Sequence, residues 1–409
     1  MSNHDFTLTP RDVLFMHDAR PMEASDAGQG ANWPRPDQLW NAVINMFHRQ
    51  WPERQEWEGD RHTCNAHDKN ADSSFRFGAL QTVGPFPLKE ENGKTTLFLP
   101  CPLDLSADDD ESKLKLLPMK LVSADRTDMP KPLKYAFQAP VLGKQKLPQW
   151  LSLEDYGRYL AREEIHSPLQ EKFFTVDRNI GIEIDSDTSA TVDGKLYQAE
   201  YLRLMSGVSM AFSASCDIKA KHRKGAMTDV FKELGVPKDA VIGGQQGVAR
   251  LDDLKGGLNL PCVKPDSDCL KVRWTLLSPL VSTGGWLPSW ICAEDGKVML
   301  RVKTEREPNE SREKWRERLA TSPVIHARLI AARIGKPIAF SGWDLQAGPK
   351  ESAGAPKKTM LAVPAGSCYV FECDSEEDVK NLWKALDGKR LSSVYGEKGF
   401  GIGVCSSYK

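Results

Sequence analysis

The sequence lacks the features that mark several large classes of protein. None of its apolar runs approaches the roughly 20 residues that a membrane-spanning helix needs. Its opening carries His4 and Asp5 where a secretory signal would need a basic flank followed by an apolar stretch. We therefore expect a protein that stays in the cytoplasm and has no membrane partner.

The nine cysteines give no disulfide framework. Their number is odd, and they are scattered from Cys64 to Cys405 without regular spacing. Paired frameworks belong mainly to small secreted domains, so cysteines in a chain of this size are typically reduced. We expect free thiols that are mostly buried.

A recognisable metal site is also missing. His62, Cys64 and His67 stand close together in a polar stretch, but a zinc site needs a fourth ligand. Cys262 or Cys269 could supply it only from far along the chain, and the paired Cys-x-x-Cys spacing is absent. We expect no metal and no cofactor.

The net charge is close to zero. A formal value of −1 argues against a protein that binds nucleic acid with its whole surface, so phosphate contacts must come from local patches. Residues 301–336 hold ten Lys/Arg against five Glu, and a second basic cluster comprises Lys219, Lys221, Arg223 and Lys224. Such runs most often form a solvated face. The patches alone therefore predict no function.

The length and the pattern of the chain indicate two α+β domains. With 409 residues, 40% of them hydrophobic, the chain is globular and too long for one comfortable core. The first half shows strand, helix, two strands, helix and a final strand, at residues 7–16, 37–49, 75–88, 95–99, 153–164 and 208–216. A hairpin is inserted before the last strand, and its two strands are residues 180–184 and 195–204. This order is a ferredoxin-like βαββαβ unit.

Local signals support these elements. Leu39, Val43 and Phe47 recur at helical spacing. Asn92-Gly93 predicts a tight turn between two strands, and Asp193-Gly194 predicts the turn of the inserted hairpin. The charged, proline-containing stretch 104–148 is expected to be rich in loops.

The second half repeats the βαββαβ order. Its elements are strand 271–280, two helical stretches within 301–336, strands 359–363 and 368–373, a helix from Ser375 to Gly388 and strand 402–406. Ser322 is expected to cap the second helical stretch, and Gly335 to end it. We place the boundary near residues 256–271, which gives an N-terminal domain of residues 1–262 and a C-terminal domain of residues 263–409.

Four glycines within residues 396–403 form the strongest local signal. Glycine lets the backbone approach a ligand closely and point its amide N–H groups at an anion. Lys398 adds charge, and Phe400 offers a ring on which a base could stack. The spacing is not that of a P-loop. A glycine-rich segment with packing demands only explains the pattern equally well.

A catalytic pair cannot be assembled from the spacings. His17 or His48 could act in metal-free RNA cleavage, which needs a general base and a general acid. No spacing selects two partners, and a histidine beside an aspartate, such as His17 beside Asp18, is more often an ordinary hydrogen-bonded residue. We expect no catalytic residue.

Several short motifs, in one order along nearly the whole chain, carry a resemblance to a known family. The opening Leu14-Phe15-Met16-His17-Asp18-Ala19-Arg20-Pro21 resembles the "LFFRDGRP" opening of the third subunit of the Cmr module, a RAMP-superfamily protein of type III-B CRISPR effector complexes. The further matches are residues 33–36, 84–86, 99–104, 181–185, 194–197, 342–344, 363–367 and 399–401.

This resemblance implies a fold and a function in antiviral defence. It implies two ferredoxin-like domains with a thumb-like hairpin near residues 178–203 and long loop insertions. It further implies a non-catalytic subunit that binds the repeat-derived 5′ tag of the guide RNA (crRNA) and bridges the large polymerase/cyclase-like subunit to the backbone subunits. The alternative is a RAMP endoribonuclease that processes the guide precursor.

The expected RNA contacts come from three places in the sequence. The opening motif contributes His17 and Arg20, the hairpin contributes Arg178, Asn179, Tyr197 and Arg203, and the glycine-rich segment contributes Lys398, Gly399, Phe400 and Gly401.

Overall fold

The computed structural model describes most of the chain. The described residues are 2–16, 33–50, 79–110, 113–125, 127–140, 146–166, 168–185, 187–188, 190–219, 227–235, 239–244, 247–303, 306–307, 310–344 and 355–408.

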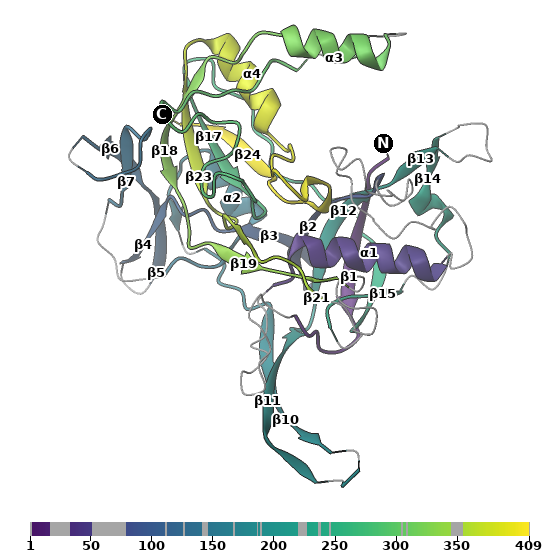
Figure 1. Cartoon of the computed structure of the whole chain (residues 1–409). Coiled ribbons are helices and arrows are strands. Elements are labelled where there is room, and N and C mark those ends of the chain that lie inside the picture. Colours follow the sequence, from purple (N-terminus) through teal and green to yellow (C-terminus); the bar gives the residue numbers. More distant parts are fainter. Residues whose placement is uncertain are drawn as a thin grey trace.

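Mixed α/β structure with few helices and mostly antiparallel strands runs through the chain (Figure 1). The first part comprises β1 (His4–Pro10), α1 (Pro36–Gln50), β2 (Gln81–Glu91), β3 (Lys94–Pro100), β4 (Leu105–Asp110), β5 (Lys113–Pro118), β6 (Lys120–Ser123), β7 (Tyr135–Gln138), β8 (Trp150–Ser152), α2 (Leu153–Leu160), β9 (Ile165–His166), β10 (Phe174–Ile184), β11 (Thr191–Leu204), β12 (Val208–Ser215), β13 (Asp217–Lys219), β14 (Met227–Asp229), η4 (Val230–Glu233), β15 (Asp239–Val241) and β16 (Val248–Asp253). The second part comprises β17 (Lys271–Leu276), α3 (Arg312–Thr321), β18 (Ala327–Arg333), β19 (Ile338–Phe340), β20 (Trp343–Asp344), β21 (Ala355–Pro356), β22 (Met360–Ala362), β23 (Cys368–Cys373), α4 (Glu376–Leu386), η5 (Gly396–Lys398) and β24 (Gly403–Ser407).

The N-terminal half is built on a seven-stranded sheet in the order β15-β16-β1-β12-β2-β3-β8. Helix α1 covers one face, as its sequence pattern predicts, because Leu39, Val43 and Phe47 are buried in one apolar core with β1 and β12. The turn between β2 and β3 is also confirmed, since Asn92 and Gly93 both have positive φ.

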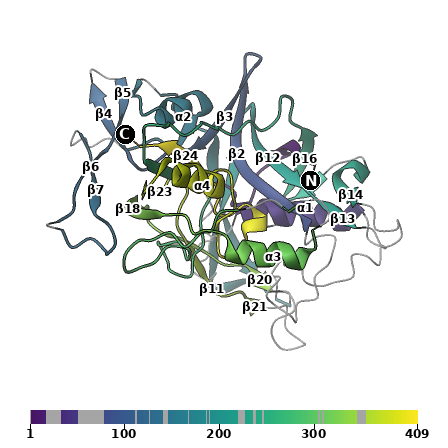
Figure 2. The ribbon, with the colours of Figure 1, turned by 90° about the horizontal axis from the view of Figure 1, so that it is seen from above.

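The C-terminal half is built on a four-stranded sheet in the order β18-β23-β17-β24. Helix α4 covers it and buries Val379, Leu382 and Trp383 against the sheet. Ser375 caps this helix as expected, because its hydroxyl accepts a hydrogen bond from the Asp378 amide at 3.1 Å. Figure 2 shows α4 and α1 over different parts of the molecule, each with its own sheet.

A third core joins the two halves. It includes Phe86 on β2, Tyr156 on α2 and Val404 on β24. At its centre the fully buried Arg273 donates to Asp104 Oδ2 at 3.1 Å and to the Tyr159 carbonyl at 2.9 Å. Burial raises the pKa of Tyr159, whose hydroxyl donates to Asp104 Oδ1 at 2.8 Å.

Two complete βαββαβ units are not confirmed. In the described part, the one-turn η4 is the only helical element in the connection from β12 to β16. The connection from β17 to β18 contains α3, which buries no residue. Strand β12 was also expected to be the last strand of its unit, but β16, further along the chain, pairs with β1 on the side opposite β12.

The helix predicted after Ser322 is wrong. Ser322 instead ends α3, its hydroxyl donating to the Leu319 carbonyl, and residues 327–333 form β18 beside β23. A short apolar run fits a buried strand as well as a helix. Here pairing with a strand some forty residues later along the chain outweighs the local helix propensity.

The inserted hairpin is longer than predicted, and its turn is elsewhere. Asp193 and Gly194 lie inside β11, and the chain reverses between Asp185 and Ala190, whose backbone groups are hydrogen bonded at 2.9 Å. The Asp185 carboxylate accepts from the Thr188 amide at 2.8 Å, which lowers the pKa of Asp185. Stretch 104–148 contains four strands that the sequence did not predict, β4, β5, β6 and β7, besides its loops.

No α-helix in the described part is long and apolar enough to cross a membrane. The eight cysteines in that part are free, and six of them are buried. This agrees with the expectation of reduced thiols.

We predict that the buried ion pair between the halves acts as a unit. Asp104→Ala should lower the free energy of unfolding by about 3–5 kcal/mol, because it leaves a buried guanidinium without its counterion. Asp104→Leu combined with Arg273→Met should cost much less than the sum of the two single changes. Urea denaturation of the unmodified protein, Asp104→Leu, Arg273→Met and the double variant measures the coupling energy between the two side chains. Additive losses would contradict it.

Candidate nucleic-acid interface

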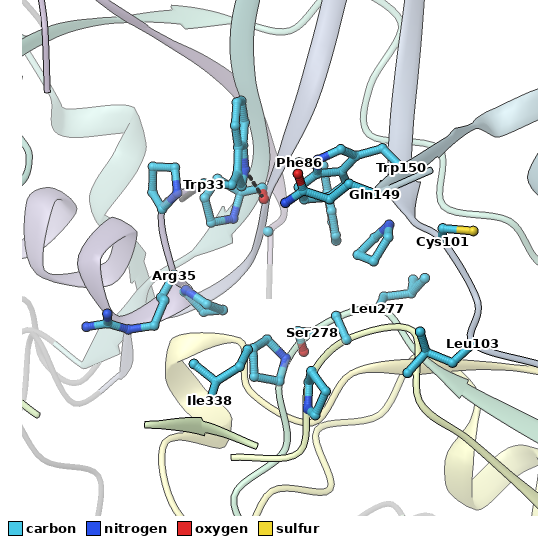
Figure 3. A pocket seen from close by; sticks show the side chains of 18 of the residues that line it. Trp33, Arg35, Phe86, Cys101, Leu103, Gln149, Trp150, Leu277, Ser278 and Ile338 are labelled. Carbon is cyan, nitrogen blue, oxygen red and sulfur yellow. Dashed lines mark hydrogen bonds between the residues drawn. The ribbon is translucent and has the colours of Figure 1, made fainter. Parts of the chain in front are cut away.

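A pocket of about 420 Å³ opens where the two halves meet. Trp33, Phe86 and Trp150 form one wall, and Ser278 and Ile338 face them from the C-terminal half (Figure 3). The remaining lining residues are Pro34, Arg35, Pro36, Gly84, Pro85, Pro100, Cys101, Leu103, Leu147, Pro148, Gln149, Leu277, Pro279, Pro364 and Ala365. The pocket is therefore largely apolar, with a few polar groups at its edge.

The wall from the N-terminal half is fixed by specific contacts. Trp33 Nε1 donates to the Pro85 carbonyl at 2.9 Å. Gly84 has φ +108°, and a Cβ there would lie 2.9 Å from the Ala211 carbonyl oxygen, so only glycine fits. Trp33 and Trp150 each pack against Phe173, with ring centroids 6.3 and 6.4 Å away. Because Phe173 directly precedes β10, this wall continues into the base of the hairpin.

Arg35 supplies the charge at the mouth of the pocket. Its guanidinium is paired with Asp37 at 3.0 Å and lies over the Phe340 ring, 5.4 Å from the centroid. Cys101, the residue directly after β3, also lines the pocket. Burial raises the pKa of its thiol. Among the lining residues that the structure describes, Arg35 and Cys101 are the only ones with ionisable side chains. No acid–base pair is available there.

The glycine-rich segment packs tightly beside this pocket. Gly399 and Gly401 have φ of +93° and +71°, as the sequence pattern suggests. A Cβ on Gly399 would lie 2.9 Å from the Thr82 carbonyl oxygen, and one on Gly401 would lie 2.4 Å from the Ser392 nitrogen. Protein backbone therefore occupies the space next to both glycines.

The side chains of this segment are also engaged. Phe400 is fully buried and stacks on Phe340 at 5.4 Å, so its ring cannot stack on a base in this structure. That part of the sequence interpretation is corrected. The Lys398 ammonium lies 4.7 Å from the centroid of Trp40 on α1 and 4.4 Å from that of Tyr395.

Arg390, which the sequence gave no reason to single out, lies under the glycine-rich segment. Its Nη2 reaches the Thr82 carbonyl at 3.5 Å, while its buried Nε has no hydrogen-bond partner among the described residues. Burial lowers the pKa of Arg390, and the buried Thr82 Oγ1 also lacks a partner in the described part. Only long-range packing brings these groups together, so no local signal reveals them.

The charged hairpin residues have carboxylate partners. Arg178 Nε donates to Glu200 at 2.9 Å. Arg203 donates to Asp177 at 2.8 Å and to Asp12 at 3.0 Å. Asn179 is exposed, and Tyr197 lies in β11 opposite Gly181.

A second hollow, of about 380 Å³, lies at the base of the hairpin. It is lined by Phe15, Tyr201 and a second glycine-rich loop, in which the Gly244 amide donates to the Phe15 carbonyl at 2.8 Å. The three glycines within residues 243–247 were a signal that the sequence reading missed.

The remaining predicted residues fall outside the described part. His17 and Arg20 lie there, as do His62, Cys64 and His67. Within the described residues, no group of three or more His, Cys, Asp or Glu side chains could hold a metal ion. The glycine-rich segment contacts Pro36 of the pocket wall, and Phe173 before β10 packs on Trp33 and Trp150 of the same wall.

Comparisons with known proteins give one family and a set of distant folds. The model of a family described as CRISPR-associated protein (Cas_Cmr3) matches residues 6–405. A chain of type III-B Cmr-beta bound to cognate target RNA is 14% identical, with a TM-score of 0.44, covering 97% of this chain and 95% of that one. A chain of the Csm3-Csm4 subcomplex of the type III-A interference complex is 10% identical, with a TM-score of 0.36, covering 90% and 92%. The search of curated proteins gave no match.

We predict that Gly401 is required for packing as well as for its backbone conformation. Gly401→Ala should destabilise the protein more than Gly93→Ala, whose φ of +75° is equally unfavourable but whose Cβ would meet nothing within 4 Å. The strain common to both is about 1–2 kcal/mol, and the overlap at Gly401 should add about 1–3 kcal/mol. Urea denaturation measures both variants. Equal losses would show that steric overlap adds nothing.

Proposed function

The chain belongs to the Cas_Cmr3 family of CRISPR-associated proteins, and we propose that it is the non-catalytic subunit that binds the repeat-derived 5′ tag of the guide RNA in a type III-B effector complex. In this role it would also bridge the large polymerase/cyclase-like subunit to the backbone subunits.

One observation carries the proposal. Four motifs that resemble the family, residues 33–36, 84–86, 99–104 and 363–367, lie far apart in the sequence but meet at the pocket between the halves. The pocket's volume lies within the roughly 300–1,000 Å³ of small-molecule sites. Its aromatic and proline walls suit a single-stranded base that is turned out of its stack.

The charges near the pocket fit a single strand better than a duplex. A duplex would require an extended basic surface, whereas here individual cations stand at intervals: Arg390 and Lys398 at the glycine-rich segment, and Arg35 beside the pocket, where it is paired with Asp37. A phosphate that reached Arg178 or Arg203 would have to displace a carboxylate, so we give these two hairpin residues a secondary place.

We further propose that both halves are ferredoxin-like domains, residues 1–262 and 263–409, each with one reduced or displaced helix. The strand order supports this. β16-β1-β12-β2 and β24-β17-β23-β18 have the same arrangement when each set is numbered along the chain. The N-terminal half retains α1, between β1 and β2, on its sheet. The C-terminal half retains α4, between β23 and β24, on its sheet.

We predict that filling the pocket weakens RNA binding. Ala365→Trp should lower the affinity of the isolated chain for tag RNA about tenfold or more, because loss of one stacked base is worth roughly 1–3 kcal/mol. The matched control is Leu361→Trp, at a residue that is 60% exposed on neighbouring β22 and does not line the pocket. Fluorescence anisotropy and thermal melting test both variants. Equal affinities for the two variants would remove the pocket from the proposal.

We predict no cleavage of repeat RNA by the isolated chain in EDTA. The pocket offers no acid–base pair, which supports binding over the alternative of a RAMP endoribonuclease. Gel analysis of end-labelled repeat RNA checks this. A cut at one defined position that disappears in His17→Ala or His48→Ala would favour the nuclease instead.

A further inference from the structure

Several cations in the C-terminal half have no carboxylate partner. Five solvent-accessible arginines of the N-terminal half each form an ion pair with an aspartate or glutamate: Arg11, Arg158, Arg178, Arg203 and Arg250. By contrast, the exposed Arg301, Lys303 and Lys389 form no ion pair with any residue that the structure describes. The chain as a whole has a net charge of −1, so these unpaired cations form a local positive patch.

Helix α3 adds three more unpaired cations. Arg312, Lys314 and Arg316 are exposed, and none of them forms an ion pair within the described part of the chain. Residues four positions apart are neighbours on a helix, where opposite charges stabilise it and like charges destabilise it. In α3 the charged pairs at this spacing are all of like charge: Arg312 with Arg316, Glu313 with Glu317 and Lys314 with Arg318. The pattern does not stabilise the helix, and it gathers positive charge into stripes.

The two groups of cations lie in one region of the C-terminal half. Helix α3 buries no residue and extends past α4, as Figure 1 shows. The Ser322 carbonyl, directly after its last turn, accepts a hydrogen bond from Arg301 Nη1 at 2.6 Å. Partial burial, together with the Lys389 ammonium nearby, lowers the pKa of Lys303. We call these six residues the α3 basic surface: Arg301, Lys303, Arg312, Lys314, Arg316 and Lys389.

The composition of the α3 basic surface suits phosphates better than a protein partner. Protein interfaces are built around aromatic and apolar anchors and are poor in lysine. On α3 the apolar side chains of Trp315 and Leu319 are already half-buried. Arginine and lysine side chains at intervals instead match the spaced charges of a nucleic-acid backbone. The exposed Glu313 and Glu317 separate the positive stripes, so a single strand that bends between cations fits better than a rigid duplex.

We propose that the α3 basic surface binds the phosphate backbone of single-stranded RNA without reading its bases. None of its six residues lines the pocket between the halves, so this contact is separate from the proposed recognition of the tag. The chain would then hold RNA at two places, through a base in the pocket and through phosphates at α3.

A glutamine variant tests the contribution of the helix. Arg312→Gln, Lys314→Gln and Arg316→Gln together keep helix propensity and change no buried side chain, so the melting temperature should not fall. Affinity of the isolated chain for labelled oligouridylate, which carries no tag sequence, should fall about tenfold or more at low salt. The slope of log affinity against log salt concentration should decrease by about two, because each phosphate contact on a single strand contributes roughly 0.7. Fluorescence anisotropy over a salt series measures both quantities.

The matched control removes the same charge elsewhere. Lys94→Gln, Lys120→Gln and Lys255→Gln change three exposed lysines outside the α3 basic surface. This variant should keep the affinity and the salt slope of the unmodified chain. Equal slopes for the helix variant and the control variant would overturn the proposal.

A second pair of changes tests the part of the surface outside the helix. Arg301→Gln with Lys303→Gln should reduce the salt slope by about one, for two lost phosphate contacts. An unchanged slope would overturn the inclusion of these two residues.

The same variants separate RNA from an acidic protein partner. If the helix variant binds oligouridylate like the unmodified chain but fails to enter the assembled complex, a protein occupies the surface and the proposal is overturned. The proposed function fails on a different result. An unmodified chain that binds tag RNA no better than oligouridylate would count against recognition of the tag, while a reduced salt slope in the helix variant would still support the α3 basic surface.

Discussion

The buried guanidinium of Arg273 is the constraint on which the arrangement of the two halves depends. A charge removed from water costs several kcal/mol unless nearby groups satisfy it. Here the satisfying groups come from three segments: Asp104 after β3, Tyr159 on α2 and Ser406 on β24, whose hydroxyl accepts at 2.9 Å. Any rotation of one sheet against the other would separate the charge from at least one of these partners. The need to keep the buried guanidinium hydrogen bonded therefore fixes the relative orientation of the two halves more strictly than apolar contact alone would.

The pocket follows from that geometry. Cys101 and Leu103 line it immediately before Asp104, and Leu277 lines it immediately after β17, the strand that carries Arg273. The residues that hold the halves together and those that form the pocket are thus neighbours in sequence. A change in the buried network should therefore alter the shape of the pocket, because the backbone that carries Asp104 and Arg273 continues directly into the pocket lining. The pocket's chemistry, mostly apolar with Arg35 among its lining residues, is consistent with the proposed recognition of a base by shape and stacking.

Local physics made much of the fold readable from the sequence. Helix α1, the Asn92-Gly93 turn and the Ser375 cap depend on residues a few positions apart, and each is confirmed. Long-range pairing was not readable. Residues 327–333 look helical until β23 is known to lie beside them. The candidate site shows the same difference between local and long-range information. Its motifs could be recognised one by one in the sequence, but their meeting at one pocket depends on the packing of the two halves around Arg273.

The sequence identified glycines and cations as candidate RNA contacts but could not say which of them make contacts within the folded protein. Phe400 is stacked on Phe340, and Arg178 is paired with Glu200, so neither is free to serve RNA without a rearrangement. A buried polar group without a partner costs roughly 1–3 kcal/mol. In the described part, Arg390 Nε and Thr82 Oγ1 are such groups, and both lie beneath the glycine-rich segment. A stable fold tolerates that cost most readily where a ligand or water completes the hydrogen bonds. The unpaired groups beneath this segment, rather than its side chains, are then where that cost falls.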